Sequence, residues 1–387
     1  MKFGSVSVVI NPPFPVKQAG HIIQVDEIFT VHDDLHARLL YLEGEGVAWL
    51  HVSADSLGLP LCVQETLEQE LSLYWNKPIN VTVSATHAHH CCDPENEGYL
   101  TFFMETVLNA AKNMRIREVG ELAVSYRSQD FDELGKSRIS NHKADAVKLD
   151  LIQILSGDTI LAEIIVHNVH PPVLYAKHPF FSAEYPGYVL QRLHGRKPEI
   201  FHTFMQGPAG DTSTRFTRKS QDYDSVIELG EKMVHKILEM KTQEAVPIPL
   251  KLSLEKKVLP LQHEFQPIDM SKMPTELSER EQITMSYGPI LREQLKEHPE
   301  KLEKEILLTM IDFGGPRIIF APNEMFSWWR TLLDASRCTL VCYSNGAAPY
   351  LTGPGQYLLT YETFTDTVTD ESKEQIVKVI RSWNGGN

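Results

Sequence analysis

Histidine residues follow two of the most apolar segments of the chain, and imidazoles at strand ends can bind a metal or transfer protons. His87 and His89 come directly after the β-branched run 79–86. Residues i and i+2 of a strand face the same side, so both imidazoles can point into one site. His170 follows the run 159–166 and precedes two prolines, which stiffen the backbone as suits a metal ligand. A surface histidine cluster and a histidine in a Pro-rich turn are the alternatives, and His167 competes with His170 for the role.

A glycine-hinged turn follows a third predicted strand, over 200–205. Its sequence, GPAGDTS over 207–213, would let backbone N–H groups approach a substrate oxygen and would expose the hydroxyl of Ser213. The turn lacks the GxSxG order of an α/β-hydrolase and the lysine of a phosphate-binding loop. An ordinary loop is therefore the alternative.

Acidic and phenolic candidates lie in the C-terminal third. Asn323 is a good N-cap for a helix predicted over 324–333, and the helix dipole favours an acid in the first turn, so Glu324 needs no catalytic explanation. Tyr350 and Tyr361 lie in a Gly- and Pro-rich stretch, where packing within a loop is the alternative to a role in a site.

The elements that must position these groups alternate between strand and helix. Hydrophobic periodicity predicts strands over 5–10, two runs within 37–53, 79–86, 147–155, 159–166, 200–205, 317–321 and 339–343, and helices over 63–74, 103–114, 184–194, 222–240 and 324–333. This order favours an α/β fold with a layered mixed sheet flanked by helices. Such sheets bind ligands at the carboxyl ends of their strands, where the candidate residues lie.

We interpret 1–387 as a single catalytic domain with one inserted segment. Residues 242–305 are charged and interrupted by prolines, and they predict a strand over 246–258 and then a long polar helix to about 308. We expect this segment to be inserted and lid-like.

Composition excludes several classes of function. The 387 residues carry 37 basic and 51 acidic side chains, a net charge of −14, which disfavours nucleic acid as a partner. The five cysteines form no CxxC pair and two of them are adjacent, which is typical of a reducing compartment. Without a signal peptide or a long apolar run, we expect a cytoplasmic protein with no transmembrane segment. The oligomeric state is left open.

Seven short segments resemble, in the right order, motifs of one known family. They are VHDDLHAR (31–38) for VHDPLYAR, SATHAH (84–89) for SATHTH, VHP (169–171) for VHPT, EYPG (184–187) for DYPG, GDTS (210–213) for GDxS, NEMF (323–326) for GEMF and SNGAAPY (344–350) for ANGYxGY. The family is that of the neutral/alkaline (non-lysosomal) ceramidases, and the resemblance is to their catalytic domain.

The resemblance implies a zinc-dependent hydrolase of an N-acyl amide bond, with one Zn²⁺ per chain. Its zinc ligands would fall on His87, His170, Glu324 and Tyr350, a set that suits zinc while one position stays open for water or substrate. The other catalytic residues would be His89 as base or oxyanion partner, Ser213 as nucleophile, and Arg138 and Tyr361 as groups that hold the reacting carbonyl. Attack by zinc-bound hydroxide and attack by Ser213 both remain open.

Several departures from the family pattern affect the substrate rather than the metal. The residues after His89 read HCCDP (90–94) instead of SGPG, Glu184 replaces an aspartate, and Ala347 stands where a tyrosine is common. We also expect no C-terminal β-domain. The sequence thus predicts an intact metal site that acts on a small-molecule or lipid-like acyl amide. The alternatives are a small soluble N-acylated or ester substrate, and a non-catalytic metal-bound binding protein.

Overall fold

Two mixed five-stranded sheets form the centre of the protein. The computed structural model describes residues 1–20, 26–139, 144–265, 279–356 and 360–384. The first sheet has the order β4-β3-β2-β1-β5, with β1 (Lys2–Val9), β2 (His36–Gly44), β3 (Val47–Ala54), β4 (Asn80–Ala85) and β5 (Arg117–Glu118). The second has the order β10-β9-β8-β6-β12, with β6 (Ala123–Asp130), β8 (Lys148–Ser156), β9 (Thr159–His167), β10 (Phe201–Gln206) and β12 (Ile248–Pro249).

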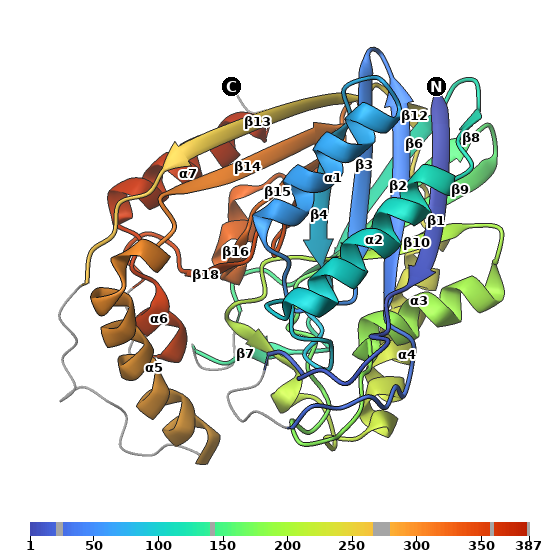
Figure 1. The fold of residues 1–387 in the computed structure, drawn as a ribbon. Helices are drawn as coiled ribbons and strands as arrows, with labels where there is room; N and C mark the ends of the chain where they lie inside the picture. The colour runs from blue at the N-terminus through green and yellow to red at the C-terminus, as the bar shows by residue number, and fades with distance from the viewer. Residues whose placement is uncertain (21–25, 140–143, 266–278, 357–359, 385–387) are drawn as a thin grey trace.

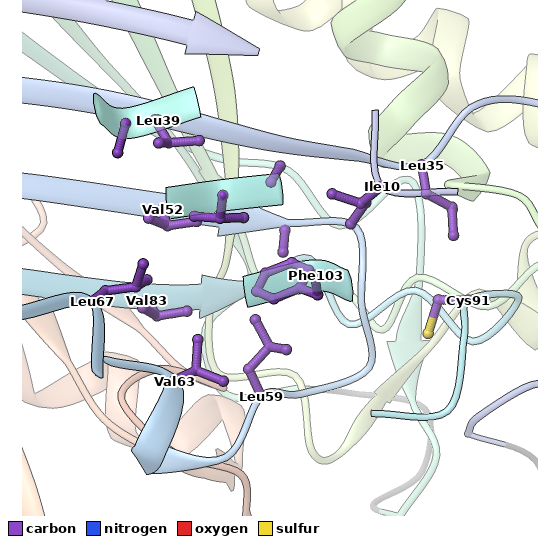
Figure 2. Close-up of a cluster of buried hydrophobic side chains, with 14 of the residues drawn as sticks. Ile10, Leu35, Leu39, Val52, Leu59, Val63, Leu67, Val83, Cys91 and Phe103 are labelled. Atoms are coloured by element: carbon purple, nitrogen blue, oxygen red, sulfur yellow. The ribbon is translucent and has the colours of Figure 1, made fainter. Parts of the chain in front are cut away.

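Helices α1 (Leu61–Tyr74) and α2 (Glu97–Asn113) cover the outer face of the first sheet (Figure 1). Val63 and Leu67 of α1 and Phe103 of α2 pack with Val52 and Val83 of the sheet, all fully or nearly fully buried (Figure 2). Burying such a side chain contributes roughly 1.5–3 kcal/mol relative to leaving it exposed. This helix layer therefore fixes β4, the strand that leads into His87.

The inner face of the first sheet packs on the second sheet. In β2, Leu39 and Tyr41 belong to the cluster under the helices, whereas Leu40 and Leu42 share a second buried cluster with Ile152 and other residues of the second sheet. The alternation has the period of two that a strand imposes. Burial on both faces explains why β2 is almost continuously apolar.

Helices α3 (Glu184–Arg196) and α4 (Tyr223–Thr242) close the other side of the second sheet, so the centre has a helix–sheet–sheet–helix order. A third sheet packs beside it in the order β13-β14-β15-β17, with β13 (Ser253–Pro260), β14 (Glu305–Asp312), β15 (Arg317–Phe320) and β17 (Cys338–Val341). Helix α7 (Asp370–Trp383) packs against this sheet. The predicted α/β architecture of mixed sheets flanked by helices is confirmed.

Two helix predictions in the C-terminal half need correction: one helix ends earlier than predicted, and the other is not a helix. The helix predicted to about 308 is α5 (Glu279–Glu297), which ends before Pro299, and β14 begins at Glu305. Proline disfavours helix in the residue before it, and Ile306, Leu308 and Met310 share one buried face, as in a strand. The inserted and lid-like character of 242–305 stays a prediction, although β13 within this segment pairs along its length with β14.

The helix predicted over 324–333 is a strand followed by a short 3-10 helix. Glu324 lies in β16 (Asn323–Met325), which pairs in parallel with β18 (Ala348–Leu351), and the 3-10 helix covers Ser327–Leu332. Asn323 is not an N-cap, because its side-chain Nδ2 donates to Pro349 O at 3.1 Å. A pairing partner more than 20 residues away here outweighs the local capping signal.

The carboxyl ends of parallel strand pairs converge on one region. Strands β3 and β4, β9 and β10, and β15 and β17 are paired in parallel. The segments that follow β4, β9, β10 and β17 supply the residues described next. All five cysteines are free. Among the described residues, no helix has the length and apolar character needed to cross a membrane.

Candidate metal centre

Three histidines from two segments meet at the carboxyl ends of the strands. His87, His89 and His170 each offer a ring nitrogen, and the three nitrogens lie within 4.8 Å of one another. The ring centroids are 4.6 Å apart for His87 and His170, 4.9 Å for His87 and His89, and 5.0 Å for His89 and His170. This group could hold a metal ion.

Backbone carbonyls orient two of the imidazoles. Nδ1 of His87 lies 2.7 Å from Leu57 O, and Nδ1 of His170 lies 3.3 Å from Ala209 O. A carbonyl can only accept, so each Nδ1 carries the proton and each Nε2 presents its lone pair to the site. This arrangement is typical of metal-binding histidines, whose second nitrogen is usually fixed by a hydrogen bond.

His89 completes the group from a different direction. Its Nε2 lies 3.0 Å from His170 Nε2, and unlike the other two histidines it is partly exposed. Gly20, at φ +80°, lies against its ring: a Cβ there would come within 2.6 Å of His89 Nδ1. A side chain at position 20 would therefore displace His89 or the loop.

The convergence of His87 and His89 has a different cause from the one predicted. Strand β4 ends at Ala85, so strand alternation does not operate at these residues. His87 instead has a left-handed backbone, with φ of 61°. Non-glycine residues in this region cost of order 1–3 kcal/mol and concentrate at functional sites. The turn, rather than the pleat, directs both imidazoles to the same place.

Glu324 and His87 face each other at ion-pair distance without forming a hydrogen bond. Glu324 Oε2 lies 3.4 Å from His87 Nε2, yet both atoms are buried and neither has a hydrogen-bond partner among the described residues. Burial alone would raise the pKa of Glu324, but His87, Arg138 and Tyr350 hold it below its usual value. Two orphaned ligand atoms of the types that zinc prefers fit a divalent cation here.

Tyr350 and Arg138 lie behind Glu324. Tyr350 is the cross-strand partner of Glu324 in the β16–β18 pair, and its hydroxyl accepts from Arg138 Nη2 at 3.0 Å. The Arg138 guanidinium also donates to Gly210 O and forms an ion pair with Glu362, with Nε and Oε1 3.0 Å apart. Arg138 is thus held in place by three different segments.

The remaining predicted residues are Tyr361 and Ser213. Tyr361 begins α6 (Tyr361–Thr365), and its ring centroid lies 6.0 Å from that of Tyr350. Burial raises the pKa of Tyr361 to about 12, so its hydroxyl stays protonated at neutral pH. Ser213 lies in β11 (Thr212–Ser213), which pairs with β7 (Lys136–Ser137), and its Oγ accepts the N–H of Arg215 at 3.2 Å.

His167, the rival of His170, belongs to the core. It is fully buried at the end of β9, and its Nδ1 lies 2.8 Å from Lys148 O. Burial lowers the pKa of His167 to about 4, so it stays neutral. His167 is not part of the three-histidine group.

Sequence reasoning missed the contacts of Glu184 and Glu362. Glu184 is fully buried and accepts N–H groups from Val173 at 2.8 Å, Leu174 at 3.1 Å and His89 at 3.3 Å. It therefore ties the loop of His89 to the loop after His170, and its burial raises its pKa to about 7. Its place in the EYPG segment was the available signal. Glu362 gave none, because its partner Arg138 is far away in sequence.

Comparison with solved structures places this arrangement in a known fold. The chain matches the neutral ceramidase from Pseudomonas aeruginosa with a TM-score of 0.77 and 15% sequence identity, over 99% of this chain and 74% of that chain. A second structure, a ceramidase complexed with C2, matches with a TM-score of 0.77 and 14% identity, again over 99% of this chain and 74% of that chain. No family model and no curated protein matches the sequence. The chain therefore has the neutral ceramidase fold, which confirms at the level of fold the resemblance drawn from the seven motifs.

Proposed function

We propose that the protein is a zinc-dependent hydrolase of N-acyl amide bonds. The observation that carries the proposal is the pair of buried, unbonded atoms His87 Nε2 and Glu324 Oε2, beside two further histidines in a neutral ceramidase fold. Bound zinc would polarise the acyl carbonyl and lower the pKa of a water molecule towards about 7.

The ligands would be His87, His170, Glu324 and Tyr350. Both histidines have Nδ1 fixed on a backbone carbonyl, so Nε2 is the atom with which each would coordinate the metal. Glu324 supplies the negative charge that balances the cation, and the Arg138 guanidinium holds the Tyr350 hydroxyl beside it. His89 is the alternative fourth ligand, because its ring nitrogen lies within the same group.

We assign His89 to proton transfer. Of the three histidines it alone is partly exposed, so an incoming substrate or water can reach it. A neutral imidazole is a suitable base near neutral pH, and proton transfer of this kind typically contributes 10²–10⁴-fold to a rate.

Arg138 and Tyr361 would stabilise the negative charge that develops on the acyl oxygen. Arg138 is positively charged and immobilised by Gly210 O and Glu362, and Tyr361 remains a hydrogen-bond donor because burial raises its pKa to about 12. Donors fixed before the reaction are worth about 3–4 kcal/mol each in such sites.

Ser213 is the alternative nucleophile. Its Oγ caps the 3-10 helix Thr214–Phe216, and no hydrogen bond described for the chain joins it to a histidine. This supports attack by water with His89 as base. We expect Ser213→Ala to retain turnover within about tenfold of the native protein, whereas loss to background would assign the serine route.

The decisive experiment combines metal analysis with a substrate panel. We expect one zinc per chain in the native protein, lost in His87→Ala and Glu324→Ala and retained in His194→Ala, a control at an exposed histidine of α3. The panel contains ceramides of increasing acyl length, N-acyl amino acids and N-acyl sugars. Hydrolysis of the soluble compounds alone would assign the small-substrate alternative. Bound zinc without hydrolysis of any amide or ester would contradict the hydrolase.

A further inference from the structure

Tyr343 has a buried hydroxyl that forms no hydrogen bond within the described part of the chain. The residue follows β17 and is only 4% exposed, and its hydroxyl has no hydrogen-bond partner among the described residues. Buried hydroxyls are normally bonded to protein, to an ordered water or to a ligand, so an unbonded one beside a site points to a partner outside the chain. Tyr99 shows the usual case, because its equally buried hydroxyl donates to Ile10 O at 3.2 Å.

The ring of Tyr343 lies flat on the imidazole of His87. The two ring centroids are 3.9 Å apart and the planes differ by 26°. The backbone imposes this contact: Ala85 N donates to Tyr343 O at 3.0 Å, and Ser84 forms an isolated bridge with Ser344. The end of β4 is thereby joined to the segment after β17.

Both stacked residues have left-handed backbones, with φ of 61° for His87 and 53° for Tyr343. A bulky aromatic residue avoids this conformation unless its surroundings enforce it. Two such residues are here in direct contact, at the ends of two segments that the backbone hydrogen bond holds together.

Tyr343 lies beside the two unbonded ligand atoms, because its ring is stacked on His87 and His87 Nε2 is 3.4 Å from Glu324 Oε2. Three atoms without hydrogen-bond partners therefore belong to one small region: the Tyr343 hydroxyl, His87 Nε2 and Glu324 Oε2. The last two suit a cation, whereas a neutral phenol is a hydrogen-bond donor.

We propose that Tyr343 is a substrate-binding residue of this site, whose hydroxyl donates a hydrogen bond to an oxygen of the bound acyl compound. The inference rests on the proposed function and adds to it a contact that none of the seven motifs indicated. The ring would meanwhile keep the His87 imidazole in place.

The test compares Tyr343→Phe with Tyr99→Phe and with the native protein. Tyr343→Phe keeps the stacked ring and removes only the unused hydroxyl, so we expect an unchanged or higher Tm and unchanged zinc content. Its kcat/KM on the best N-acyl substrate should fall roughly 10- to 100-fold, because the lost bond is made only to the substrate. Tyr99→Phe should show the converse, a lower Tm with native kcat/KM.

Two results would overturn the inference while the proposed function stands. One is native kcat/KM in Tyr343→Phe, and the other is a fall in Tm like that of Tyr99→Phe, which would mean that the hydroxyl bonds within the protein. A native protein that hydrolyses no acyl compound would instead overturn the proposed function, and the inference with it. Tyr343→Leu, which removes the ring, should in addition weaken zinc binding, and native zinc affinity in that variant would contradict the role given to the stacked ring.

Discussion

Glu324 and Tyr350 are cross-strand partners in the short parallel pair β16–β18, beside a register shift between Asn323 and Glu324. Their side chains reach the same region as His87, to which Glu324 Oε2 comes within 3.4 Å. A two-strand pair thus presents a carboxylate and a phenol side by side. The shift matters because a slip of one residue would turn Glu324 to the opposite face.

The carboxylate of Glu324 should determine metal affinity. Glu324→Gln keeps the shape of the side chain but removes its charge, so we expect zinc affinity to fall at least about tenfold in a competition titration with a chromophoric chelator. Glu374→Gln, at an exposed position of α7, is the matched control and should bind zinc normally. Equal affinities in the two variants would remove Glu324 from the ligand set.

Replacing His89 should affect catalysis without affecting metal binding. If it is the base, His89→Ala keeps one zinc per chain and loses about 10²–10⁴-fold in kcat. Metal content by elemental analysis and kcat on the same preparation provide the two readouts. Loss of the metal together with activity would instead make His89 a ligand, as its place among the three histidines also allows.

The sequence allowed the alternation of strand and helix to be predicted, because hydrophobic periodicity is a local property. It also placed His87, His89 and His170 at strand ends, where the structure brings them together. The environment of Glu324 could not be found in this way. Asn323 and Glu324 carry a sound local signal for a helix start, and only pairing with β18 overrides it. The stacking of Tyr343 on His87 likewise depends on a long-range contact between β4 and the segment after β17.

Asp211 should make the stability of the fold depend on pH. Asp211 is buried and accepts two hydrogen bonds from Ser327, of 2.6 and 2.7 Å, and burial raises its pKa from 3.8 to about 6. Since the folded state holds the proton more tightly, the contribution of Asp211 to stability is complete below about pH 4 and is lost as the pH rises through about 6.

Asp211→Asn removes this titration and keeps an oxygen for the Ser327 N–H. The difference in free energy of unfolding between Asp211→Asn and the native protein should therefore change with pH. It should shift by on the order of 2 kcal/mol in favour of the variant as the pH rises from about 4 to about 7, measured by urea denaturation. Asp222 is the control, because hydrogen bonds from Ser220 and Ser225 lower its pKa below 3.8, so Asp222→Asn should run nearly parallel to the native protein over the same pH range. Parallel pH curves for Asp211→Asn and the native protein would refute the assignment.

Lys373 should be essential for holding the two tyrosine-bearing segments together. This buried side chain of α7 donates to Asp366 Oδ2 at 2.7 Å and to Thr352 Oγ1 at 2.9 Å. Thr352 follows the strand of Tyr350, and Asp366 follows the helix of Tyr361. The ammonium group therefore links both tyrosine segments to one helix.

Lys373→Met leaves the Asp366 carboxylate buried without its cation. Losing one partner of such a pair costs about 3–5 kcal/mol, so we expect a clear fall in the free energy of unfolding. Lys378→Met, at an exposed position of the same helix, should have almost no effect. Adding Asp366→Asn to Lys373→Met should restore part of the loss, since no charge then remains unpaired. If the double variant were less stable than Lys373→Met, the stabilising contribution of Asp366 would have to come from its hydrogen bonds to Thr352 rather than from the ion pair.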